Sequence, residues 1–226
     1  SHTADAWDHS LPSRVRINVL MEMDKMKDAA KAARSFLDRM PAWATYPFAP
    51  DPSIDFYEPI YRAGEMTKRE LEEKRAEWIE KERRRAHDGR SAKEPWATWA
   101  TVYGSFAETR EEALEAISHA PQDEVVPSAG RRGLFLDFAL GKVYALAARW
   151  DDAMPYLTPA VSTSDTFDKV IVVIKARLYL AQAEEAKGDI AAAKATYEKI
   201  TETWPKTTSS RTVKRAAERL ALISRD

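Results

Sequence analysis

Residue types that could catalyse a reaction or bind a metal are present, but not at the spacings that such chemistry requires. The four histidines show no paired metal-ligand spacing such as HExxH. The seven glycines form neither a GxGxxG nor a GxxxxGKS/T loop that would cradle a phosphate, and no GxSxG nucleophile elbow is present. Because the chain has no cysteine, disulfides and thiolate catalysis are excluded. We therefore expect no catalytic residue, no cofactor and no metal, and we predict that the protein is not an enzyme.

Neighbouring charges fit solvated helix faces better than acid–base catalysis or nucleic-acid binding. The carboxylate pairs Glu72-Glu73 and Glu111-Glu112 have basic neighbours. The densest basic run, Arg83 to Arg85, lies in a segment (67–87) that carries six Glu against eight Lys and Arg, which dilutes its field. The whole chain has a net charge of −1, so it has no general attraction for nucleic acid or anionic lipid. We expect no nucleic-acid partner.

The composition is that of a folded protein of one elongated or two compact domains. Hydrophobic residues make up 44% and charged residues 31% of 226 residues, and no apolar stretch is long enough to span a bilayer. The first ten residues have no initiator Met, no basic start and no apolar signal core, so we expect a fragment of a longer protein or a processed chain. The lack of cysteine fits any compartment, and the cytoplasm is only slightly favoured.

Helical periodicity dominates the chain from Pro12 to Pro41. Pro12 suits a first helical turn, with Ser10 as its N-cap. Apolar residues then recur at spacings of three and four, which places them on one helix face. A break near Asp24-Lys25 would make this region a helical hairpin, and an unbroken helix is the competing interpretation.

The pattern fails between Pro41 and Tyr61, where five prolines and six aromatic residues share 21 positions. Pro blocks continuous helix, whereas aromatics need something to pack against. We predict an ordered, extended segment that lies over the helices and fills or borders their groove. Thr67 and Glu70 then form a capping box that opens a charged helix to about His87.

Helical signals return at Pro95 and continue to the end of the chain. Thr109 and Glu112 form a second capping box, but the preceding turn, 105–108, is one residue too long for a simple hairpin. The segment 121–133 is a loop, and Val170–Ile174 is taken as helix because it continues without a break into the next helix. Pro155 and Pro159 should shorten or bend their helix. A last helix is capped by Ser209 or Ser210.

The stretch 176–205 resembles a tetratricopeptide (TPR) repeat, a pair of short antiparallel helices that stacks into a solenoid. The resemblance rests on Leu180-Ala181, Gly188-Asp189, Ala193, Tyr197 and Pro205. Weaker matches are Leu140-Gly141-x2-Tyr144 and Trp96-x2-Trp99-Ala100-x2-Tyr103.

The resemblance implies an all-α fold, an α-solenoid of TPR-like hairpins with an inserted Pro- and aromatic-rich segment and a C-terminal capping helix. The single domain would span 1–226. Its parts would be repeats at about 11–41, 95–121, 134–160 and 174–205, an insertion at 42–94, and a cap at 209–225.

In TPR proteins the first helices line a concave groove, which implies a function in binding. We expect a non-catalytic scaffold that holds a protein or peptide segment. The alternative is a regulatory or sensory arm of a larger protein, such as a bacterial signalling kinase. By register, the polar residues that would line the groove are Arg14, Asn18, Thr101, Lys142, Lys175 and Gln182.

Overall fold

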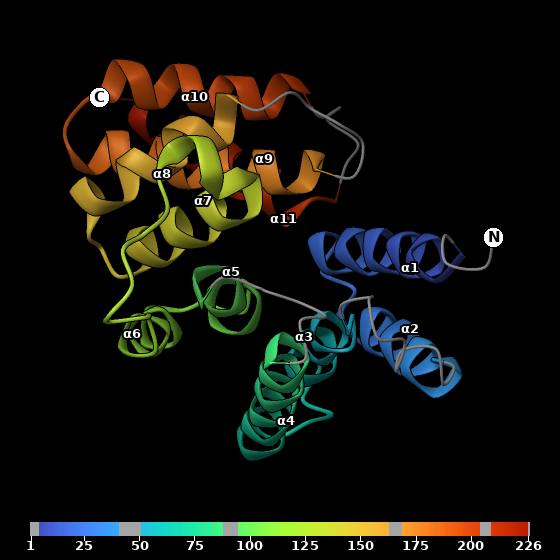
Figure 1. Cartoon of the computed structure of the whole chain (residues 1–226). Helices are drawn as coiled ribbons and strands as arrows, with labels where there is room; N and C mark the ends of the chain where they lie inside the picture. Colours follow the sequence, from blue (N-terminus) through green and yellow to red (C-terminus); the bar gives the residue numbers. More distant parts are fainter. Residues whose placement is uncertain (1–4, 41–50, 88–94, 163–168, 204–208, 226) are drawn as a thin grey trace. The chain divides into compact units, whose positions relative to one another are not determined.

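The computed structural model describes residues 5–40, 51–87, 95–162, 169–203 and 209–225 (Figure 1). Within those ranges the chain is helical and contains no strand, which confirms the prediction of an all-α protein. None of the described helices is both long and apolar enough to cross a membrane. The chain separates into two compact units, residues 1–94 and 95–226, and each is described by itself. A single repeat domain over 1–226 stays a prediction.

The first unit is built from two helical hairpins. Its helices are α1 (Asp5–Glu22), α2 (Met26–Arg39), α3 (Ile54–Arg62) and α4 (Lys68–His87). The α1–α2 turn confirms the predicted break. Asp24 has a left-handed φ of 60°, and the Lys25 amide donates to the Leu20 carbonyl at 2.8 Å, which is the six-residue bond of a Schellman motif.

The predicted start of the first helix was wrong. Helix α1 begins at Asp5, so Pro12 lies inside it, and Ser10 is a buried helical residue and not the N-cap. Pro12 removes one backbone donor, and the residue is exposed. One missing hydrogen bond did not end the helix.

The extended conformation predicted up to Tyr61 is also wrong over Ile54–Arg62, which forms α3. Most of the prolines in that segment precede the helix, and only Pro59 lies within it. Helix α3 buries Ile54, Phe56 and Ile60, and the Phe56 ring stacks on Phe36 of α2 at 3.9 Å between centroids. Phe56 is therefore packed, within a helix, and the prediction that the segment fills or borders a groove stays a prediction. Residues 41–50, with the other aromatics expected to pack there, lie outside the described residues.

Helix α4 starts at the predicted capping box. The Thr67 amide donates to Glu70 Oε2 at 2.7 Å, and the Glu70 amide donates to Thr67 Oγ1 at 3.2 Å. Its buried stripe contains Leu71, Arg75, Trp78 and Glu82. These four residues recur at spacings of four, three and four, so a single face of α4 is covered.

The second unit is a row of helices with a second layer packed on it (Figure 1). Its elements are α5 (Pro95–Trp99), the π-helical η2 (Ala100–Gly104), α6 (Arg110–Ser118), α7 (Ala129–Leu146), α8 (Trp150–Ser162), α9 (Val170–Ala186), α10 (Ile190–Thr203) and α11 (Arg211–Ile223). In one row η2, α7, α9 and α11 are successive neighbours. In the other layer α6, α8 and α10 each pack on two consecutive members of that row. Stacked hairpins produce this order of neighbours.

Two tight turns of the second unit repeat the Schellman geometry of the first. Ala148 and Gly188 have φ of 59° and 82°. The Arg149 and Asp189 amides each donate to a carbonyl five residues earlier, at 2.9 Å. Helix α9 includes Val170–Ile174, as predicted, and Ser210 Oγ accepts from the Val213 amide to cap α11. Helix α8 runs through both of its prolines to Ser162.

The extra residue predicted in the turn at 105–108 is absorbed within a helix. The Ser105 amide donates to the Ala100 carbonyl, five residues earlier, at 2.8 Å. This is a π-helical hydrogen bond, which takes up one more residue than an α-helical one. The capping box then opens α6, because the Thr109 side chain accepts from Glu112 and the Glu112 side chain accepts from Thr109. Ala113 follows in the fully buried position expected at a helix crossing.

Candidate functional site

Helices α7 and α9, which pack against each other, carry three of the predicted binding residues. The Phe138 ring of α7 contacts the Tyr179 ring of α9, with 6.5 Å between centroids. Residues three or four positions away on a helix share a face with these aromatics. We use the name α7–α9 face for the set Phe135, Phe138 and Lys142 of α7 and Lys175, Tyr179 and Gln182 of α9.

Exposure differs sharply across the α7–α9 face. Phe138 and Tyr179 are buried, and Lys175 and Gln182 are half-buried. Phe135 is 59% exposed and lies in the first turn of the regular part of α7, because Gly133, two residues earlier, has a non-helical φ of 68° and ψ of 162°. An exposed ring beside polar, half-covered side chains is typical of a contact surface.

Lys142 lies at the covered end of this face. Its ammonium donates to the Ser105 carbonyl at 2.7 Å and lies 5.5 Å from the centre of the Phe138 ring. Only 2% of the residue is exposed. The hydrogen bond and the aromatic ring offset part of the cost of burying this charge. Lys142 is therefore an interior residue in this conformation.

The other three predicted residues are elsewhere. Thr101 Oγ1 donates to the Ala97 carbonyl of its own helix at 2.8 Å. Arg14 and Asn18 belong to the first unit, where Arg14 is paired with Asp55 of α3 at 3.0 Å and Asn18 is exposed on α1. The predicted set is thus divided between the units: Lys175 and Gln182 are half-buried on α9, and Lys142 is buried on α7.

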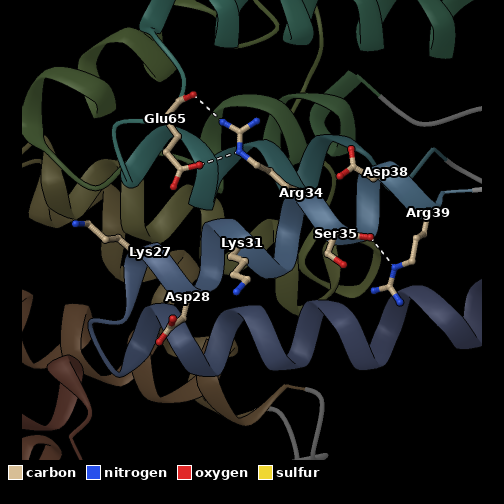
Figure 2. A pocket seen from close by; sticks show the side chains of 8 residues that line it. All are labelled: Lys27, Asp28, Lys31, Arg34, Ser35, Asp38, Arg39 and Glu65. Carbon is tan, nitrogen blue, oxygen red and sulfur yellow. Dashed lines mark hydrogen bonds and ion pairs between the residues drawn. The ribbon is translucent and has the colours of Figure 1, made fainter.

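A second candidate is a shallow depression on the first unit, between α2 and the α3–α4 turn (Figure 2). Arg34 Nε donates to Glu65 Oε2 at 2.8 Å, and Arg34 Nη2 donates to the Glu65 carbonyl at 2.9 Å. Arg39 Nε donates to the Ser35 carbonyl at 2.7 Å. The lining residues are Lys27, Asp28, Lys31, Arg34, Ser35, Asp38, Arg39 and Glu65. Cations and carboxylates alternate here, so the depression selects for neither sign of ligand.

The basic run of α4 is partly neutralised within its own helix, by two carboxylates for three arginines. Arg83 and Arg84 donate to Glu80 at 2.9 and 2.8 Å, and Arg85 donates to Glu82 at 2.8 Å. This arrangement fits a solvated face. In the described parts of the chain, no three or more His, Asp and Glu side chains are grouped so that they could hold a metal ion.

The pairing makes a titration prediction. Hydrogen bonds from Arg83 and then Arg84 lower the pKa of Glu80 to about 2. Since the folded-state pKa is lowered, the pair's contribution to stability is present above the ordinary pKa and is lost as the pH falls towards 2. In an NMR titration, replacing both arginines by glutamine should move the Glu80 pKa back towards its ordinary value. The pKa of Glu70, lowered mainly by the Thr67 amide, should not change.

Some residues of the second unit were not selected from the sequence: Phe135 of the α7–α9 face, and the pair Glu108 and Arg211. Phe135 stands in the apolar run Leu134-Phe135-Leu136, which looks like core unless helix phase is counted. Glu108 and Arg211 form an ion pair at 3.1 Å although 103 residues separate them. No local sequence pattern predicts an ion pair between residues so far apart in the chain.

Comparison with known proteins does not add a relative: no protein-family model, no curated protein and no solved structure matches this chain.

Proposed function

We propose that this protein is a non-catalytic binding scaffold, and that its second unit holds a segment of a partner protein on the α7–α9 face. The single observation that carries the proposal is the exposed Phe135 ring, at the start of the regular part of α7, on a pair of packed helices whose α9 also carries the half-buried Lys175 and Gln182. Rigid aromatic anchors dominate the energetics of protein recognition, and polar neighbours set its specificity.

The chemistry of the face suggests what the partner segment contains. An apolar side chain would cover Phe135, while a carbonyl or carboxamide group would pair with the Gln182 amide. Lys175 adds positive charge, which favours an acidic group in the same segment. The segment would be short, because only two helices contribute to the face.

The test is a selection of peptides that bind the whole chain from a displayed random library. For a selected peptide, Phe135→Ala should weaken binding by about tenfold or more, the effect of losing a buried aromatic anchor. Gln182→Ala should weaken it less. The matched control is Leu114→Ala, which removes another exposed apolar side chain (49% exposed) from α6. Equal affinities for the Phe135→Ala and unmodified proteins would contradict the proposal.

A further inference from the structure

The loop that follows η2 packs against the α7–α9 face. Its Ser105 carbonyl accepts the buried Lys142 ammonium, and the next two residues, Phe106 and Ala107, are each only 2% exposed. A loop between helices usually runs over the surface with its side chains in water. Here the loop inserts an aromatic side chain and covers the end of the face where Lys142 lies.

An ion pair fastens the end of this loop to the last helix. Glu108 accepts from Arg211 Nη2 at 3.1 Å, and their side chains are 19% and 28% exposed. Beside Arg211, Ser210 and Thr212 are buried at 1% and 3%. Within the row η2, α7, α9, α11, the pair therefore joins the two ends of the row, with α7 and α9 between them.

The position of Arg211 is not explained by the stability of its own helix. It occupies the first turn of α11, where the helix macrodipole disfavours a cation, and that turn contains no acidic residue. The carboxylate of Glu108 offsets this unfavourable placement from outside the helix. The electrostatics thus favour docking of α11 against the loop over α11 alone.

We infer that residues 105–108 form a gate over the α7–α9 face, and that the Glu108–Arg211 ion pair holds this gate closed. The inference rests on the proposed function, since the gate regulates access to the Lys142 end of the proposed binding face, while Phe135 stays exposed with the gate closed. A half-buried pair suits this role, because its net strength is small enough for a bound segment to displace it. Opening would uncover Phe106 and the Lys142 end of the face.

Hydrogen exchange and an apolar dye test the gate without any partner. In Glu108→Gln and Arg211→Gln, the amides of Ser105 and Phe106 should exchange about 1.5- to fivefold faster, the range expected for losing such a pair. Fluorescence of 1-anilinonaphthalene-8-sulfonate, which reports exposed apolar surface, should rise. Glu111→Gln, an exposed carboxylate on α6, is the matched control and should change neither signal.

The charge swap Glu108→Arg with Arg211→Glu separates gating from damage to the fold. It should return exchange and dye fluorescence to the values of the unmodified protein, because the pair is restored with its polarity reversed. Unchanged exchange in both single variants would overturn the inference, as would a swap that remains as open as they are. A failed peptide selection would count against the proposed function and would leave these measurements of the gate unaffected.

Discussion

Replacing Leu157 with alanine is expected to destabilise the second unit by about 2–5 kcal/mol, the range for emptying a fully buried leucine site. Leu157 of α8 is 0% exposed and packs directly over Gly141 of α7. A Cβ built on Gly141 would lie 2.6 Å from Leu157 Cδ2 and 3.2 Å from the Leu157 backbone nitrogen. The absence of a side chain at Gly141 is therefore what allows α7 and α8 to cross closely.

The same contact predicts whether Gly141→Ala raises or lowers the free energy of unfolding. Alanine stabilises an exposed helix interior by about 1 kcal/mol relative to glycine. At Gly141 the clash should reverse this and cost about 1–3 kcal/mol. Ala195→Gly, at an exposed position of α10, measures the difference in helix propensity between alanine and glycine without a clash. Chemical denaturation of the two single variants and of the Gly141→Ala, Leu157→Ala double variant should show that the added methyl is tolerated better once Leu157 is shortened. Strict additivity would mean that the two residues do not determine the crossing.

Local signals predicted the turns unevenly, and the reason is chemical. At Gly188 the glycine itself predicts a left-handed backbone conformation. At Asp24 the turn is predicted because the helical period breaks there. Ala148 has the same conformation, but alanine gives no local sign of it. Its strain, about 1–2 kcal/mol for an L-residue, has to be offset by the packing of α7 against α8. That packing cannot be seen in one turn of sequence.

Prolines were expected to block, shorten or bend helices more often than they do. Pro12, Pro59, Pro155 and Pro159 all lie within helices. Each removes one backbone donor, a cost that the buried faces of these helices offset. The capping boxes at Thr67 and Thr109 were predictable because each is complete within four residues.

The candidate site could be predicted only in part, since its geometry depends on contacts between distant residues. Helix phase predicted that Lys142, Lys175 and Gln182 lie on one side of α7 and α9, but Lys142 is an interior residue, and the binding role of the other two stays a prediction. It could not show that the loop at 105–108 covers Lys142, because that depends on how η2 ends and where α11 docks. Long-range pairs of this kind determine which residues of a face stay open.

The last large effect is expected from removing α11. Its residues Val213, Ala216 and Leu220 pack on a cluster that includes Tyr197 and Ile200 of α10. Arg219 of α11 donates to Glu185, and Glu185 also accepts from the Tyr197 hydroxyl at 3.0 Å. Burial, and then this hydrogen bond, raise the pKa of Tyr197, so the phenol stays neutral and remains a donor.

A chain that ends at residue 208 would lose the apolar cover and the Arg219 partner together. We expect a loss of more than about 3 kcal/mol in the free energy of unfolding, together with self-association through the bared side of α9 and α10. Denaturant unfolding and sedimentation measure the two effects.

Removing only residues 224–226 is the control and should change neither. The Arg219→Ala variant isolates the ionic part, which should be the smaller one, since half of the Arg219 side chain is open to solvent and water screens it. A truncated chain that stayed monomeric and kept its unfolding midpoint would show that α11 does not act as a cap.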